Sequence, residues 1–315
     1  MNKYFTSGLA QILSVFFLVV MFQVTVLAEE VPLNSESKSM LIRTCRTIKR
    51  DVESVTRKID DFFVSGQKVS QIPETKYKLR FELFAEEDGR FDLRPRINTH
   101  IFLPNLENRL AFVLNNYSRD ILPKEDLKKR TLEEQITAGF RYYFPWTKEW
   151  TTSFGYGLRF HGIKPVIYSR FDFLRHCIEL NNWLIYFQQN FFWYSDDGAG
   201  ELTQIDFDRP LNDTFLFRTT TSALWSRESD GLELEQAFLL SIDFKKKERM
   251  IFIRTSVSGH KSSELQLDNY SLDITYRTQL GKPWLYFYVT PQLEFPREEN
   301  FKDIPSIRLG VELFF

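Results

Sequence analysis

Apolar and polar residues alternate with a period of two from residue 76 to the end of the chain. In the first such stretch Leu79, Phe81 and Leu83 alternate with Arg80 and Glu82. Because successive side chains of a β-strand point to opposite faces, this pattern predicts strands with one apolar and one polar face. Turn residues separate fourteen such strands, with twelve as the alternative count. The fourteen are expected at 76–86, 91–103, 109–117, 132–144, 150–161, 165–175, 182–194, 200–208, 213–226, 232–244, 249–259, 267–280, 283–295 and 304–315.

These predicted strands are longer than those of most soluble proteins. The stretch 232–244 has 13 residues, whereas globular strands typically have about 5–6. Aromatic residues gather near the strand ends, as they do where a barrel meets the two surfaces of a membrane. These residues are Tyr142, Tyr143, Trp146, Trp150, Trp183, Trp193, Tyr194, Trp284 and Tyr286. The pattern therefore predicts an all-β fold in which residues 75–315 form an antiparallel, up-and-down transmembrane β-barrel of 12–14 strands, with 14 preferred.

The predicted loop lengths agree with an even number of strands, in which the first strand begins and the last strand ends on the periplasmic side. Short turns are expected at the periplasmic end, at 245–248 and 281–282, and longer loops outside, at 117–131, 260–266 and 296–303. Strands six to eight are the least regular part. Both faces of the seventh strand carry aromatic residues, and Gln189 falls on its predicted lipid face.

Residues 1–28 have the features of a signal peptide. Lys3 precedes an apolar stretch from Leu9 to Val26, and Val26-Leu27-Ala28 fits a cleavage site. An uncleaved membrane anchor is the alternative. Removal of this segment would place the mature chain outside the cytoplasm.

The segment 29–74 is predicted to contain an amphipathic α-helix in the periplasm, before the barrel. Its apolar stripe consists of Leu41, Cys45, Ile48, Val52, Val55, Ile59 and Phe62. A helix that lies on one partner surface is the preferred interpretation, and a coiled coil between chains is the alternative.

Composition narrows the class of protein. The chain has 315 residues, with 41 lysines and arginines against 42 aspartates and glutamates. This balance provides no basic surface for nucleic acid. The 16% of aromatic residues excludes a disordered chain, and no second apolar segment is long enough for a transmembrane helix.

The C-terminal residues Arg308-Leu309-Gly310-Val311-Glu312-Leu313-Phe314-Phe315 resemble the assembly signal of bacterial outer-membrane proteins. The resemblance is carried by Arg308, Gly310, Leu313 and the terminal aromatic Phe315. Three further stretches are similar to a poorly characterised group of Gram-negative outer-membrane proteins: 59–63, 103–110 and 284–297. These resemblances imply an outer-membrane location, with outer-membrane lipid and the barrel-assembly machinery as partners.

The polar face of the predicted strands carries the main functional signal. Its arginines are Arg80, Arg94, Arg96, Arg109, Arg141, Arg159, Arg170, Arg218, Arg254, Arg277 and Arg308. Its carboxylates are Glu82, Asp92, Asp172, Glu233, Glu235, Asp243, Asp273, Glu294 and Glu312. Such charges are acceptable inside a barrel if the interior is wet or the charges are paired.

Two main functions compete on this pattern. The first is a passive diffusion channel for small polar or anionic solutes, with a weak anion preference because arginines outnumber carboxylates. The second is a barrel closed by salt bridges, with a structural or surface-binding role. An outer-membrane lipid hydrolase is a third, less favoured function, and the chain is predicted not to be an enzyme.

Candidate chemistry is sparse, and no metal or cofactor is expected. His260-Lys261-Ser262 contains a histidine and a possible nucleophile, but a solvated loop is the preferred interpretation. The stretch Asp196-Asp197-Gly198-Ala199-Gly200-Glu201 offers oxygen ligands without the spacing of a calcium loop, so it is interpreted as a hairpin turn.

Cys45 and Cys177 are the two cysteines of the chain. In an oxidising compartment an even pair suggests a disulfide, which would join the helix to a turn between strands six and seven. The alternative is that Cys45 is a free thiol within the apolar stripe.

Overall fold

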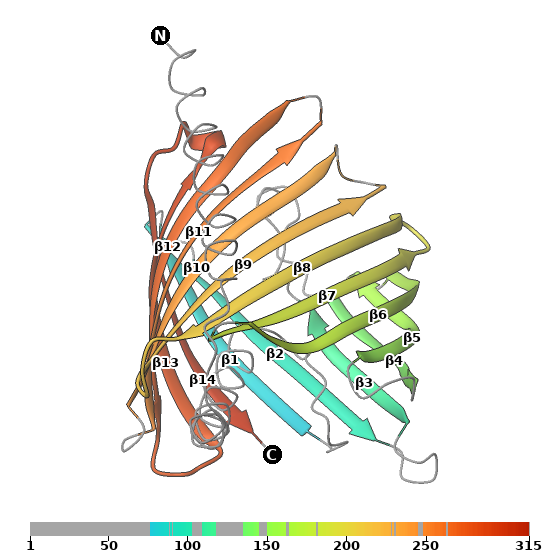
Figure 1. Ribbon diagram of the computed structural model, residues 1–315, viewed down its shortest axis with the longest axis horizontal. Helices are drawn as coiled ribbons and strands as arrows, with labels where there is room; N and C mark the ends of the chain where they lie inside the picture. Colours follow the sequence, from blue (N-terminus) through green and yellow to red (C-terminus); the bar gives the residue numbers. More distant parts are fainter. Residues whose placement is uncertain are drawn as a thin grey trace, which may run out of the picture. The chain divides into compact units, whose positions relative to one another are not determined.

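The computed structural model describes residues 76–87, 89, 91–102, 109–117, 135–144, 150–161, 164–180, 182–227, 229, 231–244, 248–262 and 264–314 (Figure 1). The predicted signal peptide at 1–28 and the predicted helical segment at 29–74 lie outside these residues and stay predictions.

The described residues form a closed, antiparallel β-barrel. Each strand pairs with its neighbours in the chain, and β14 returns to pair with β1, which lies beside it in Figure 1. The strands are β1 (Lys76–Glu86), β2 (Phe91–Phe102), β3 (Leu110–Tyr117), β4 (Gln135–Phe144), β5 (Trp150–His161), β6 (Lys164–Leu180), β7 (Trp183–Tyr194), β8 (Gly198–Pro210), β9 (Phe215–Ser226), β10 (Leu232–Phe244), β11 (Arg249–Lys261), β12 (Leu265–Gln279), β13 (Leu285–Pro296) and β14 (Ile304–Phe314). The all-β class, the up-and-down topology and the preferred count of 14 strands are thereby confirmed.

Two predicted boundaries are wrong. Strand β6 continues to Leu180, so Cys177 lies within this strand and not in the turn after it. A register shift between Arg175 and Ile178 interrupts the pairing there, which explains why the alternation fades before the strand ends. The predicted loop 260–266 is also wrong, because β11 extends to Lys261 and β12 begins at Leu265.

The alternating pattern becomes two different faces of the barrel wall. Large apolar side chains point outward and are exposed, with Phe91 at 73% and Leu93 at 66% as the extremes. The outward set on other strands includes Phe81, Leu83, Phe140, Tyr156, Leu158, Ile167, Leu272, Ile274 and Ile307. An apolar outer surface of this kind needs apolar surroundings, because water would not stabilise it.

Tryptophans mark both ends of this outer surface. Trp150 and Trp183 begin β5 and β7, whereas Trp193 and Trp225 lie near the opposite ends of β7 and β9 and are each 45% exposed. The predicted aromatic set also included Tyr143, Tyr194 and Tyr286, which follow the inward parity of their strands, so only part of that set lies on the outer surface.

The only helical element among the described residues is a short 3₁₀ turn, η4 (Arg297–Glu299), before β14. No helix in this part of the chain is both long and apolar enough to cross a membrane.

Candidate functional site: the inner face of the barrel

The inner face is polar and follows the parity predicted from the sequence. Contacts that bridge strands identify it: Arg277 of β12 reaches Glu312 of β14, and Arg159 of β5 reaches the turn after β7. The register places the remaining predicted charges on the same face, except that Arg109 immediately precedes β3.

Glu312 is the centre of the largest charge cluster. Arg80 donates to its Oε1 at 2.9 Å from Nε and 2.5 Å from Nη2, and Arg277 donates to Oε2 at 2.7 Å. Lys78 Nζ lies 3.5 Å away, and the carboxylate is fully buried beneath these side chains. The cluster joins β12, β14 and β1, so it closes the barrel electrostatically where the first and last strands meet.

A second ion pair is buried on the wall formed by β8 and β9. Arg218 donates from Nε and Nη2 to the two oxygens of Asp208, at 2.5 and 2.7 Å. Next to it, Asp206 accepts hydrogen bonds from Gln204 and Thr220. Sequence reasoning missed both aspartates, although β8 parity alone, Gln204-x-Asp206-x-Asp208, would have placed them inward.

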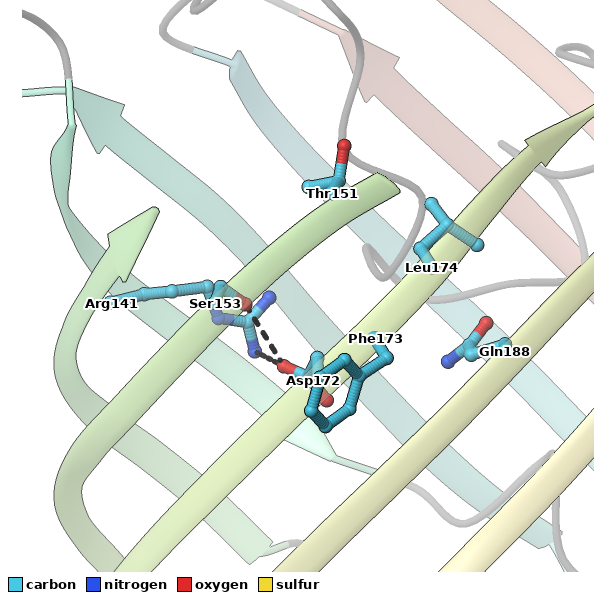
Figure 2. A pocket seen from close by; sticks show the side chains of 7 residues that line it. All are labelled: Arg141, Thr151, Ser153, Asp172, Phe173, Leu174 and Gln188. Atoms are coloured by element: carbon cyan, nitrogen blue, oxygen red, sulfur yellow. Dashed lines mark hydrogen bonds and ion pairs between the residues drawn. The ribbon is translucent and has the colours of Figure 1, made fainter. Parts of the chain in front are cut away.

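Figure 2 shows a small pocket on β4 to β7, with a volume of about 10 Å³, enough for about one water molecule. Arg141 and Ser153 point toward Asp172, with an ion-pair distance of 3.5 Å and a hydrogen bond of 3.3 Å. Arg170 donates to the other oxygen of Asp172 and also bonds to Asn190. Two arginines thus share one carboxylate, which leaves this region with a local positive charge.

Arg159 ties the hairpin between β7 and β8 to the inner wall. Its Nη2 donates to Asp196 at 2.8 Å and to Asp197 at 2.6 Å, and the guanidinium lies 3.8 Å from the ring centroid of Tyr194. The predicted hairpin at this position is therefore present, with β8 beginning at Gly198. Its two aspartates serve as arginine partners.

Several other predicted inward charges form single ion pairs. Arg254 pairs with Glu235 at 2.8 Å, Arg94 with Asp92 at 2.7 Å, and Arg96 with Glu82 at 3.4 Å. The remaining charges that were predicted to point inward also lie on the inner face: Glu233, Asp243, Asp273, Glu294 and Arg308. Among the described residues, no hydrogen-bond partner reaches Oδ2 of buried Asp273.

This pairing changes the predicted charge balance. Among the described residues, nine of the arginines predicted to point inward have a carboxylate within 4 Å: Arg80, Arg94, Arg96, Arg141, Arg159, Arg170, Arg218, Arg254 and Arg277. The sequence count also omitted Lys78 and three buried carboxylates, Asp206, Asp208 and Asp268. These additions remove the slight positive excess on which the predicted anion preference depended.

One part of the inner face is apolar, which the sequence pattern did not predict. Leu184, Leu216, Leu239, Met250 and Phe252 pack together with Tyr288. Most of these residues lie at the end of the barrel where β7 begins with Trp183 and β9 begins with Phe215. These side chains are almost fully buried, from 0% exposed for Phe252 to 6% for Leu239, so they form a small apolar core on the inner side of the wall.

His260 lies in β11 and not in a loop, contrary to the sequence prediction. Its Nδ1 is 2.8 Å from Oδ2 of Asp268, and Arg297 lies 3.4 Å from the other oxygen of that carboxylate. Asp268 occupies the extra position of a register shift in β12, which turns it to the same side as Asn269. Ser262, the candidate nucleophile, is exposed in the turn after β11.

Other predicted sites fall partly outside the described residues. Arg308, Gly310 and Leu313 lie in β14, but Phe315 is beyond the described chain. Cys45 is likewise outside it, so the disulfide with Cys177 stays a prediction. Within the described strands, no cluster of three or more His, Cys, Asp or Glu side chains is arranged to hold a metal ion.

The geometry defines this part of the chain as a closed fourteen-strand barrel with an apolar outer face and a charged inner face. No protein-family model matches the chain, and no curated protein matches it either.

Several solved structures are similar in fold at very low sequence identity. The outer membrane protein OpdK from Pseudomonas aeruginosa has a TM-score of 0.46 and 10% identity, with 76% of this chain and 98% of that chain covered. OmpT, an outer membrane protein of Vibrio cholerae, has a TM-score of 0.44 and 8% identity, with 79% and 100% covered. The KdgM porin has a TM-score of 0.37 and 7% identity, with 75% and 98% covered. The architecture described above rests on the strand pairing of this chain itself.

Proposed function

We propose that this protein is an outer-membrane diffusion channel for small polar solutes. The observation that carries the proposal is the division of one closed barrel into an apolar outer face and a charged inner face. A closed barrel satisfies all of its backbone hydrogen bonds internally, so it can stand in lipid. Fourteen strands also enclose more space than the eight-strand barrel that side chains just fill.

The outer surface has the dimensions of a membrane span. Ten positions separate Trp183 from Trp193 along β7. At about 3.3 Å per residue and a tilt of about 40°, this corresponds to a height of ~25 Å, which matches the apolar band of outer-membrane barrels. Interfacial tryptophans are the expected markers of its two edges.

Two outward-facing arginines support a membrane boundary at the end marked by Trp150 and Trp183. The Arg175 guanidinium lies 5.4 Å from the Trp150 ring centroid, and that of Arg209 lies 5.3 Å from Trp183. A cation stacked on an interfacial indole keeps its charge near headgroups and water while its stem covers apolar surface.

The inner face favours solutes by polarity more than by charge sign. Because nine arginines already have carboxylate partners, the wall presents alternating charges and few uncompensated ones. We therefore propose weak selectivity among small polar solutes, without the anion preference that the sequence count suggested.

The C-terminal strand supports a further part of the proposal. Arg308, Gly310 and Leu313 fit the assembly-signal pattern, and we propose that, together with Phe315, they are recognised by the barrel-assembly machinery before insertion into outer-membrane lipid.

A closed structural barrel is the second candidate, and one observation favours it. Phe252, Glu312 and Tyr288 are inward residues, yet each is at most 1% exposed. In the channel these values come from side chains that cover one another along the wall, as Arg80 and Arg277 cover Glu312.

Location and transport are tested on the wild-type protein. In fractionated cells, the channel is expected in the outer membrane as a folded form that migrates differently before and after heating. Liposomes that contain the purified protein should swell in isotonic solutions of small sugars and amino acids. Recovery in the soluble periplasm would contradict the location, and folded protein without swelling would favour the closed barrel.

A further inference from the structure

The outer face of β7 to β10 carries a row of polar side chains that includes two glutamines, whereas most outward residues of the barrel are apolar. We call these residues the Gln/Thr belt: Gln189 on β7, Thr203 on β8, Thr219 and Thr221 on β9, and Gln236 on β10. Strand parity places each of them outward, between neighbours such as Phe187, Phe191, Phe217 and Phe238.

Hydrogen bonds hold the belt together in two groups. Thr203 Oγ1 donates to Gln189 Oε1 at 2.5 Å. In the second group, Thr221 Oγ1 donates to Gln236 Oε1, and Gln236 Nε2 donates to Thr219 Oγ1, both at 2.6 Å. Among the described residues, no acceptor bonds to Gln189 Nε2, and Thr221 is exposed. The belt thus retains polar groups that could bond to another molecule.

Gln189 and Thr221 of the belt lie at a similar depth, between the two tryptophan levels. Four positions separate Gln189 from Trp193 on β7, and four separate Thr221 from Trp225 on β9. With about 3.3 Å per residue and the usual strand tilt, both residues lie ~10 Å below the outer edge of the apolar band. Lipid headgroups do not reach this depth, and lipid tails offer no hydrogen-bond partner.

Near the middle of other strands, the outward residues are mainly apolar. Phe81, Phe140, Tyr156 and Leu272 are examples, each more than a third exposed. The belt is therefore a local departure from a surface that otherwise suits lipid. A polar group buried without a partner is costly, so the departure needs a partner that supplies hydrogen bonds.

We propose that a second copy of this chain covers the belt, so that two barrels pair side by side in the membrane. This inference goes beyond the proposed channel function but rests on its membrane-spanning part. Two copies inserted in the same direction are related by a rotation about the membrane normal, which keeps every residue at its depth. The belt of one copy therefore meets the same belt of the other.

The chemistry of the belt is complementary to itself. It contains only amides and hydroxyls, which both donate and accept, and no charge that would repel its own copy. Ala223, two positions above Thr221 on the outer face of β9, is small and lets the two walls approach closely. Across three strand spacings of about 4.8 Å, the belt is ~14 Å wide, which suits the contact between two convex barrels.

Cysteine cross-linking in native outer membranes tests the pairing. The variant Thr221→Cys is made together with Cys45→Ser and Cys177→Ser, so that the new thiol is the single one. The matched control is Leu272→Cys in the same background, an outward residue of β12 on another part of the wall. Oxidation should produce a covalent dimer of this chain for Thr221→Cys and only monomer for Leu272→Cys.

A second variant separates the interface from the fold. Gln189→Leu combined with Gln236→Leu should abolish the dimer seen by native mass spectrometry, while the heat-modifiable barrel is retained. Three results would overturn the proposal: monomer alone for Thr221→Cys in heat-modifiable protein, a cross-link to a different protein, or equal cross-linking of both cysteine variants. If carbonate extraction releases the protein from the membrane, the proposal that the barrel spans the membrane is wrong.

Discussion

The hydroxyl of Tyr288 on β13 donates a 2.6 Å hydrogen bond to Oε2 of Glu82 on β1, across the intervening strand β14. The tyrosine ring reaches its partner by lying over Gly310, which pairs with both residues in the register. A Cβ atom at Gly310 would be only 2.3 Å from the ring. A glycine in the last strand thus permits a hydrogen bond that links the barrel across its closure.

Gly310→Ala is therefore expected to destabilise the folded barrel, because its methyl group cannot fit beneath Tyr288. Overpacking of this kind costs about 1–3 kcal/mol. The measurement is the urea midpoint of unfolding in detergent micelles. Gly155→Ala is the control, since the nearest atom to a Cβ at this inner-face glycine is 3.8 Å away. Equal midpoints for the two variants would contradict the role given to Gly310.

Arg218→Met should lower stability strongly, because it removes the guanidinium that binds both oxygens of the buried Asp208 carboxylate. Breaking a buried ion pair in this way costs about 3–5 kcal/mol. Unfolding in urea measures the loss, and the double variant Asp208→Leu with Arg218→Met should recover much of it. Arg94→Met is the control, because its pair with Asp92 is partly exposed (21% and 28%) and worth about 0–1 kcal/mol. A double variant less stable than Arg218→Met would rule out the explanation.

Arg159→Gln should shift ion selectivity toward cations. The substitution removes the positive charge that balances Asp196 and Asp197 near the hairpin between β7 and β8, and charges near a pore entrance bias permeation. The reversal potential under a potassium chloride gradient reports the shift, and Arg159→Lys, which keeps the charge, should resemble the wild type. An unchanged reversal potential in Arg159→Gln would show that ions do not pass this cluster.

Deletion of Phe315 is expected to reduce the amount of folded protein in the outer membrane, because it removes the terminal aromatic of the assembly-signal pattern. Quantitative blotting of unheated membrane samples measures the folded fraction. Phe315→Tyr keeps an aromatic terminus and should assemble as the wild type does. Normal assembly of the deletion variant would show that Phe315 does not act as part of an assembly signal in this chain.

The strands could be predicted from the sequence because a barrel in lipid enforces strict alternation. In β1, every second residue from Tyr77 to Leu83 is apolar, and the structure places each of these outward. Parity also placed inward the arginines that pair across strands, such as Arg80 and Arg277. One physical constraint accounts for both results: one face of each strand lies against an apolar environment and the other against a polar one.

The departures arise where that constraint is broken locally. The extra residue in β12 turns Asp268 inward out of parity, so its contact with His260 was invisible in a period-two pattern. The register shift in β6 hid the end of that strand and the place of Cys177. A single sequence also does not show which residues are neighbours on adjacent strands. Parity predicts the face on which a side chain lies, but the pairing of Arg218 with Asp208 follows only from the register of β8 and β9.

The central claim is that the barrel provides a water-filled passage across the outer membrane, and single-channel recording in planar bilayers tests it most directly. Purified, heat-modifiable protein should produce steady conductance steps in potassium chloride. Because nine inward arginines are paired with carboxylates, the wild-type reversal potential in a salt gradient should lie close to zero. Silent bilayers with protein that is folded and inserted would contradict the account and identify a closed barrel.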